Sequence, residues 1–416
     1  MSPTASRPTA LLILGTMLAL LPIVAISGPG HTAPVDFINI LFIAAYWCVI
    51  VARRASPDFP FLWPLWVVLL GSCIGLYCAP SLATGLLTIT QEVYLYVWFV
   101  TMAHFLAWSC RLTSVIAIWA AVAALLGVLA FGDVHFGLLH GLMLEGANRA
   151  QGTFENPNMF GNYLLISFFL TWAAARGGRR FLYLALPALV AGIQATASNG
   201  ALLGFLGGCC GAVAVDRRYR SPQAIGALLI IVAVGMGVVS IWHDQVETMA
   251  MEVISAERGE IAGAALKGYG ERTELWSEAA DIIRRTPTGV GPGNFQILSG
   301  SVSGDYNSAH NDYLGMLVER GPLGLVGWFA FLAAIGLLLF RLSLVADRSP
   351  LALEPLCGLF AAIVAHAGVV ELSHFRHVWL ALALMVATLT QAKMGQQVPS
   401  SVTLVVAPHG PLLEGA

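Results

Sequence analysis

A histidine in the polar stretch SAHND occupies a position suited to acid–base chemistry. His310 stands directly before an expected helix over 311–320, which leads through Gly321 and Pro322 into a long apolar segment. A helix N-terminus disfavours positive charge, so the imidazole stays neutral and keeps a nitrogen that accepts a proton. These are the properties of a general base near neutral pH. The alternative is a loop histidine that forms structural hydrogen bonds.

Four polar residues on the same expected helix support this candidate. Asn311 or Asp312 is placed to cap the helix N-terminus, since both side chains accept hydrogen bonds from backbone N–H groups. Glu319 and Arg320 are expected to pair with each other before the chain turns. We include Asn311 and Glu319 among the supporting site residues.

A second candidate is Arg149 in the segment NRAQGTFENPNMFGNYL. Asn156, Pro157 and Asn158 follow it at the start of an apolar span. Free N–H groups at a helix N-terminus and a nearby guanidinium together favour an anion, above all a phosphate. The same pattern equally fits an ordinary N-capped helix with an arginine that extends towards the membrane surface.

A third candidate is Arg272, in the predicted amphipathic helix ERTELWSEAADIIRR over 271–285. Trp276 follows four residues later and shares its face. Arg272 is either a ligand for a phosphate or one partner of an ion pair on a solvated helix. The glycine-rich segment 289–295, GVGPGNF, lacks the lysine and the strand-to-helix context of a nucleotide-binding loop.

Three histidines and a glutamate lie around the last predicted turn: His366, Glu371, His374 and His377, with Arg376 as an additional cation. Their spacing has no recognised metal-ligand geometry. Packing and hydrogen bonding at the rim of a site is the favoured interpretation, and we expect no metal and no cofactor.

Composition shows which elements must position these groups. Of 416 residues, 57% are hydrophobic and 11% are charged, whereas soluble domains carry about 25% charged residues. Apolar runs recur along the chain, and about 20 such residues cross a bilayer as a helix. The net charge of −2 offers nothing to nucleic acid. The seven cysteines lie within or beside apolar runs, without zinc-site or disulfide-framework spacing. The sequence therefore predicts an all-α polytopic membrane protein.

About twelve transmembrane helices are predicted, at 10–27, 37–52, 61–78, 92–109, 113–131, 157–175, 181–197, 200–215, 223–242, 322–341, 351–371 and 375–393. The distribution of Lys and Arg over the short loops places both termini in the cytoplasm. The long loop at about 243–321 then lies on the opposite, periplasmic side. The span at 200–215 is short and glycine-rich, which suits close helix packing.

We expect a single integral membrane domain over 1–393, with a disordered cytoplasmic tail over 394–416. The segment 10–27 is interpreted as a retained helix rather than a signal peptide, since counting it as a span keeps every later loop on a consistent side. Costly polar chemistry belongs in a wet vestibule, so the active groups are expected on the periplasmic face.

Three stretches, in order, resemble the O-antigen ligase and polymerase superfamily of bacterial envelopes: RAQGTFENPNMFGNYL, RTELWSEAADIIRRTPTGVGPGNF and SAHNDYLGMLVERGPLGLVGWF. The resemblance covers roughly 148–330, and the rest of the chain in topology alone. It implies location in the bacterial inner membrane. It also implies transfer of a glycan from undecaprenyl diphosphate to an acceptor hydroxyl, without nucleotide or metal. Lipid A–core or a growing glycan would be the acceptor.

By motif position, the resemblance makes His310 the general base and Arg149 and Arg272 the diphosphate ligands. Fixed guanidinium groups in a water-poor site stabilise charge on a departing pyrophosphate. Ligase, O-antigen or exopolysaccharide polymerase, and protein glycosyltransferase remain alternatives within this class. A membrane transporter or flippase is the alternative from another class, although apart from Glu92 the spans carry almost no charge.

One position departs from the family pattern. The superfamily usually has an arginine in a Ser-Arg-Gly turn between two mid-chain spans, where this chain has Asn199. Either Arg149 or Arg376 supplies the missing charge, or the chain takes a different substrate.

Overall fold

The computed structural model describes residues 8–23, 33–54, 61–109, 111–145, 149–154, 156–216, 274–299, 308–345 and 349–397. Within these residues the chain is almost wholly helical, as predicted. The helices are α1 (Pro8–Leu20), α2 (Pro34–Ala52), α3 (Leu62–Gly75), η2 (Leu76–Cys78), α4 (Leu82–Ser109), α5 (Leu112–Phe136), α6 (Pro157–Arg176), η3 (Arg180–Ala185), α7 (Leu186–Ala195), α8 (Asn199–Val215), a helix over 274–285, α11 (Phe295–Leu298), α12 (Asp312–Val345), α13 (Leu353–Ala367) and α14 (Arg376–Gln397).

Five of the described helices are long and apolar enough to cross a membrane: Pro34–Ala52, Leu82–Trp108, Leu112–Phe136, Asp312–Leu344 and Arg376–Met394. Shorter apolar helices lie at Leu62–Cys78, Arg180–Ala195, Asn199–Val215 and Leu353–Ala367. Every predicted span except one overlaps a described helix. The exception, 223–242, lies outside the described residues, as do 243–273 and 300–307 of the predicted long loop.

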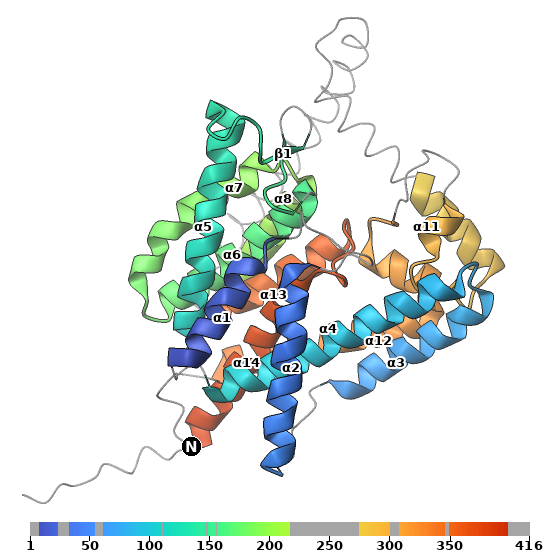
Figure 1. The fold of residues 1–416 in the computed structure, drawn as a ribbon, viewed down its shortest axis with the longest axis horizontal. Helices are drawn as coiled ribbons and strands as arrows, with labels where there is room; N and C mark the ends of the chain where they lie inside the picture. Colours follow the sequence, from blue (N-terminus) through green and yellow to red (C-terminus); the bar gives the residue numbers. More distant parts are fainter. Residues whose placement is uncertain are drawn as a thin grey trace, which may run out of the picture.

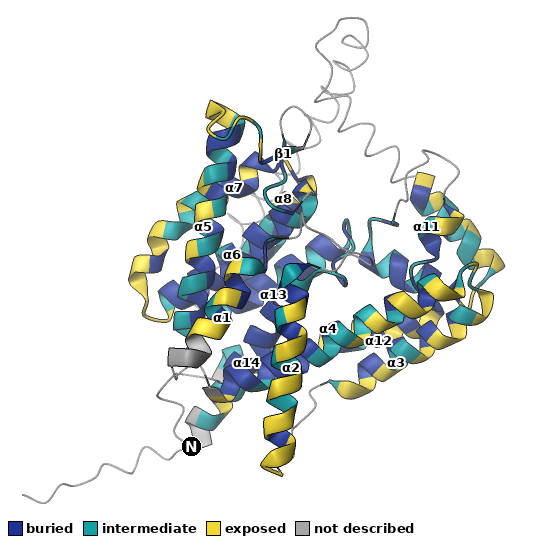
Figure 2. Ribbon diagram, in the orientation of Figure 1, coloured by how far each residue is buried: buried dark blue, intermediate teal, exposed yellow. Residues whose placement is uncertain are grey.

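The surface of the bundle is apolar. Phe37, Leu41 and Val51 on α2 are 66%, 70% and 73% exposed, and Trp63 and Trp66 point outward on α3. Exposed residues follow the outer faces of these helices in Figure 2. Water does not tolerate contiguous apolar surface of this kind, whereas lipid does. The chain is a multi-pass membrane protein.

The helices form two groups joined by a central pair (Figure 1). Helices α5 to α8 make one group, and α3, α4 and α12 make the other. Between them, α13 packs on α8 and α6, while α14 packs on α4, α6 and α12. Every side chain from His377 to Leu389 on α14 is buried.

Glycines bring α8 and α13 close together, as the sequence of the short span predicts. A Cβ atom on Gly358 of α13 would lie 2.6 Å from the carbonyl oxygen of Gly208 on α8. Such contact is the usual reason for small residues between membrane helices. The described cysteines form no disulfide.

Hydrogen bonds join the first turns of α6 to the N-terminus of α8, the C-terminus of α13 and the N-terminus of α14, and join the start of α12 to the turn before α14. The C-terminus of α7 is bonded to that of α5 and, through Thr196 and Ser198, to the N-terminus of α8. These termini therefore share one end of the bundle, which we call the site end.

Candidate functional site

His310 lies at the start of α12 at the site end, partly exposed. Its backbone has a φ of 47°, a left-handed conformation that few residues other than glycine adopt. The Oδ1 atom of Asn311 accepts the N–H of Leu314 at 3.1 Å, so Asn311 caps the helix. Asp312 instead accepts the N–H of Ser373 at 3.2 Å. The structure thus places His310 at a capped helix start, as predicted.

Trp276 contacts the backbone directly before His310. Its indole N–H donates to the carbonyl of Ala309 at 2.9 Å. The helix over 274–285 presents the predicted apolar stripe inward, with Leu275 and Ala279 buried against the first half of α12. Arg272 lies outside the described residues, so its position remains a prediction.

The glycine-rich segment 289–295 packs against a break in α12. Gly321 interrupts the helix with a φ of 64° and a ψ of −168°. The N–H of Gly291 donates to the carbonyl of Glu319, which precedes the break, at 2.8 Å. A Cβ on Gly289 would lie 2.5 Å from the same oxygen. The glycines therefore allow the backbone of 289–295 to pack directly on that of α12. This packing explains why the segment is rich in glycine without a bound ligand.

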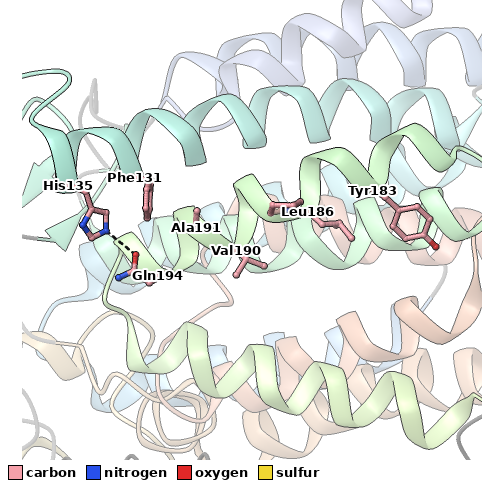
Figure 3. Close-up of a pocket in the computed structure, with 8 residues that line it drawn as sticks. Phe131, His135, Tyr183, Leu186, Val190, Ala191 and Gln194 are labelled. Carbon is pink, nitrogen blue, oxygen red and sulfur yellow. Dashed lines mark hydrogen bonds between the residues drawn. The ribbon is translucent and has the colours of Figure 1, made fainter.

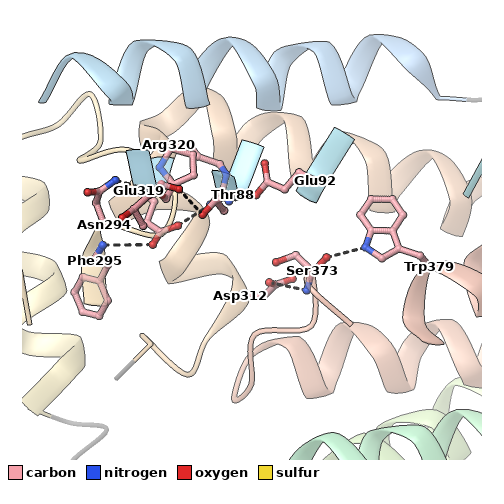
Figure 4. A network of polar contacts seen from close by, with 11 residues as sticks. Thr88, Glu92, Asn294, Phe295, Asp312, Glu319, Arg320, Ser373 and Trp379 are labelled. Carbon is pink, nitrogen blue, oxygen red and sulfur yellow. Dashed lines mark hydrogen bonds and ion pairs between the residues drawn. The ribbon is translucent and has the colours of Figure 1, made fainter. Parts of the chain in front are cut away.

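Arg320 is buried between two carboxylates (Figure 4). It forms an ion pair with Glu92 of α4 and a second with Glu319 at 3.1 Å. The other Glu319 oxygen accepts the N–H of Phe295 at 3.4 Å. The sequence predicts the pair of neighbours, but it gives no signal for Glu92, which is 228 positions from Arg320. Glu319 thus belongs to a structural network beneath the site.

Arg149 is carried on a β-hairpin between α5 and α6, in which β1 (Leu144–Glu145) pairs antiparallel with β2 (Arg149–Ala150). Asp133, in the last turn of α5, holds the loop that leads to this hairpin. Its carboxylate accepts the N–H groups of Leu139, Gly141 and Met143 at 2.8, 3.0 and 2.9 Å. A carboxylate with three such donors fixes the loop, and so the base of the hairpin.

The Arg149 guanidinium reaches the turn between α7 and α8. Its Nε donates to the carbonyl of Thr196 at 3.3 Å, and a terminal nitrogen donates to Oδ1 of Asn158 at 3.4 Å. The hydroxyl of Ser198 donates to the same Asn158 oxygen at 2.9 Å. Neither Thr196 nor Ser198 carries a sequence signal for this contact.

Asn156 caps α6 and accepts the N–H groups of Asn158 and Met159 at 2.8 and 3.2 Å. These donors are satisfied within the protein, as the N-cap interpretation expects. Asn199 is the exposed first residue of α8, in the turn that Arg149 contacts. A guanidinium therefore contacts the turn that leads to the position where the resemblance implies an arginine.

Arg376 is engaged elsewhere. It forms a two-point ion pair with Asp36 of α2, and its Nε lies 2.6 Å from Oδ1. The hydroxyl of Tyr94 donates to the same oxygen at 2.8 Å. Of the two arginines considered as replacements for the absent one, Arg149 contacts the relevant turn, whereas Arg376 ties α14 to α2.

Two of the clustered histidines meet on one amide. Nδ1 of His366 and Nε2 of His377 each lie 2.8 Å from the side chain of Asn162, one turn along α6 from Asn158. In the described part of the chain, no three His, Cys, Asp or Glu side chains are grouped to hold a metal ion. The amide joins three helices by buried hydrogen bonds, so these two histidines pack as expected but in the interior of the bundle and not at a rim.

Further contacts link α6, which Arg149 touches, to the start of α12, which follows His310. Asn162 ties α6 to the helices on either side of the turn 368–375. Ser373 in this turn bonds to Asp312, two residues after His310. The two candidate groups therefore share one end of the bundle, on separate elements joined by the final turn.

A groove of about 840 Å³ runs along the surface between α5 and α7, and none of the predicted site residues lines it (Figure 3). The ring of His135 and the amide of Gln194 lie 3.2 Å apart at one end of it. The rest of its lining is mostly apolar: Phe131, Tyr183, Leu186, Pro187, Val190 and Ala191.

Comparison with known proteins supports the resemblance. Residues 182–329 match the model of the O-antigen ligase family. The matched segment contains Asn199, Arg272, Trp276 and His310, while Arg149 precedes it. The match indicates an enzyme of the O-antigen ligase and polymerase type, working in a membrane on glycan and lipid-linked substrates. No curated protein matches the chain.

Proposed function

We propose that this protein transfers a glycan from undecaprenyl diphosphate to an acceptor hydroxyl at the periplasmic face of the bacterial inner membrane. The acceptor is lipid A–core in the ligase form of the proposal. This assignment places the product in lipopolysaccharide biosynthesis. The polymerase form, in which the acceptor is a growing glycan, remains the alternative.

In the proposed reaction, the acceptor oxygen attacks the anomeric carbon of the donor sugar. The bond between that carbon and the diphosphate oxygen breaks, and His310 takes the acceptor proton. Arg149 and Arg272 stabilise the negative charge that develops on the departing diphosphate. A positioned general base contributes roughly a hundredfold to ten-thousandfold to such a step.

The observation that carries the proposal is the position of Arg149 against the turn that holds Asn199. Where the superfamily pattern places a cation on α8, this chain brings one from a neighbouring hairpin. A partly exposed histidine at the start of α12 lies at the same end of the bundle. The supporting residues have different roles. Asn156 and Asn311 cap helices. Asn158 accepts the hydroxyl of Ser198, and Trp276 donates to the backbone of Ala309. Glu319 and Arg376 form buried ion pairs.

The transporter alternative depends on ionisable groups within the spans. Glu92 is the principal one predicted there, and it is paired with Arg320. A carboxylate held in a buried ion pair suits a structural role, so the described residues give no specific support to transport.

Reconstitution with purified components tests the proposed reaction. The protein in proteoliposomes is given lipid-linked glycan and lipid A–core in the presence of EDTA, and the product is separated on a gel. We expect product with the wild type and a loss of at least a hundredfold with His310→Ala. His140→Ala is the matched control, because His140 also has a left-handed backbone, with a φ of 54°. Full activity of His310→Ala would remove the base assignment.

A deletion strain separates ligase from polymerase. Loss of a ligase leaves O-antigen on its lipid carrier, whereas loss of a polymerase leaves single repeat units on the core. Complementation by the wild type and failure by His310→Ala would connect either phenotype to the same site.

A further inference from the structure

We propose that Trp276 and Glu371 are positioning residues that hold His310 in its working orientation by fixing the two peptide groups on either side of Ala309, the residue before it. The inference rests on the proposed role of His310 as the general base. Glu371 lies in the turn 368–375 and Trp276 in the helix over 274–285, so two separate segments converge on one residue of the chain.

The contacts occupy both polar atoms of Ala309. Its carbonyl accepts the indole N–H of Trp276 at 2.9 Å, and its N–H donates to Oε1 of Glu371 at 3.0 Å. Ala309 is fully buried. A buried backbone N–H or C=O that lost its partner would be left unsatisfied, which is costly. The two side chains therefore set the orientation of the two peptide groups that flank Ala309.

The conformation of His310 explains why such a restraint is needed. Its φ of 47° is left-handed, and for a residue with a Cβ that conformation persists only where the surroundings enforce it. On the following side, the Asn311 cap and the contact of Asp312 with Ser373 hold the helix start. On the preceding side, the restraint is the pair of hydrogen bonds that Trp276 and Glu371 make with Ala309, which we call the clamp. His310 is the residue between two fixed points.

The room for the Glu371 carboxyl is also built into α12. A Cβ on Gly315, one turn past Asn311, would approach Oε1 of Glu371 to 3.0 Å. Glycine at this position lets the carboxyl reach the N–H of Ala309. The contact needs an accepting oxygen and does not need a negative charge. Glutamine supplies the same oxygen, whereas leucine does not.

Steady-state kinetics of glycan transfer test this clamp. Trp276→Phe keeps the ring and deletes the donor, and Glu371→Leu keeps the volume and deletes the acceptor. We expect each to lower kcat at least tenfold while KM for the lipid-linked donor stays within twofold, because the base is misplaced but the donor still binds. Glu371→Gln should retain at least half of kcat. Trp119→Phe is the matched control, since it deletes a buried indole hydrogen bond elsewhere, from Trp119 of α5 to Ser167 of α6 at 2.7 Å.

The outcomes separate this inference from the proposed function. If His310→Ala is inactive while Trp276→Phe and Glu371→Leu keep normal kcat, the clamp is overturned and the base assignment stands. If His310→Ala is fully active, the base assignment fails first. Melting temperature in detergent is measured for each variant. A kcat loss in Trp119→Phe as large as that in Trp276→Phe would reduce the effect to general destabilisation and overturn positioning.

Discussion

The Nε atom of Arg149 lies 3.3 Å from the carbonyl oxygen of Thr196, three residues before Asn199. The hairpin of β1 and β2 therefore brings a guanidinium to this turn. In the superfamily pattern, the arginine belongs to the turn itself. A cation stabilises a diphosphate through its position, so the element of the chain that carries the cation matters less than where the charge lies.

A double variant that moves the guanidinium from Arg149 to position 199 tests whether Arg149 replaces the superfamily arginine. Arg149→Ala should lower transfer at least a hundredfold, because one ligand of the diphosphate is lost. Adding Asn199→Arg to that variant should recover at least tenfold, because it restores a cation at the exposed start of α8. Rates with the reconstituted lipid-linked donor give the answer. No recovery in a correctly folded double variant would contradict the replacement.

The pair of Arg376 with Asp36 should act on stability. Both side chains are largely buried, 14% and 6% exposed. Removing one member leaves the other charge without its partner, at a cost of about 3–5 kcal/mol. Arg376→Ala and Asp36→Ala should therefore each lower the melting temperature in detergent strongly, while the double variant should lose much less than their sum. Strict additivity would show that the pair carries no coupling energy.

A side chain introduced at Gly321, in the break of α12, should destabilise the fold. A Cβ on Gly321 would meet the carbonyl oxygen of Thr288 at 2.7 Å, in addition to the strain of a φ of 64°. Gly137 provides the comparison, because its φ is 62° and nothing lies within 4 Å of the position that a Cβ would occupy there. Gly137→Ala should cost about 1 kcal/mol, and Gly321→Ala clearly more. Equal unfolding midpoints for the two variants would argue against the backbone clash.

Glu371 should make stability depend on pH. Burial and the carboxylates of Glu319 and Asp312 raise its pKa from 4.5 to about 8, although Arg320 opposes the shift. Between these values the folded chain holds a proton that the unfolded chain has released. Stability from this group is therefore complete below pH 4.5 and is lost as pH rises towards 8.

The variant Glu371→Gln carries no titrating group at this position. We expect the wild type to lose up to about 1.4 kcal/mol per pH unit across this range from Glu371, with the variant showing a flatter profile. Unfolding midpoints from about pH 5 to about pH 8 in detergent measure both. Parallel profiles would show that this carboxyl does not titrate in the interval.

Much of the fold could be predicted because lipid imposes simple rules. Runs of apolar residues indicated the helices, and Gly321 with Pro322 indicated the break in α12. The helix over 274–285 also presents its predicted stripe to the protein. The start of α4 at Leu82, ten residues before the predicted span, was missed because Thr84, Gly85 and Thr88 make that part less apolar.

The site was harder to predict, because its contacts join distant segments. Spacing placed His310 before a capped helix and paired Glu319 with Arg320. It gave no sign that Asp36 would take Arg376, or that Glu92 would reach Arg320. Sequence order cannot supply such pairings, since each depends on which helices become neighbours. For Arg149, the structure confirms the capped helix, because Asn156 caps α6, while the guanidinium contacts Thr196 in the turn before Asn199 and its role as a diphosphate ligand stays a prediction.

The burial of α14 has a consequence for biosynthesis. This helix follows every other described helix in sequence, so the ribosome delivers it after α4 and α6 have entered the bilayer. Until then, the ion pair between Arg376 and Asp36 cannot form. A nascent chain that ends before the turn 368–375 would carry His310 without the contacts of Glu371 and Ser373, so the proposed site would be complete only after this turn and α14 have been made.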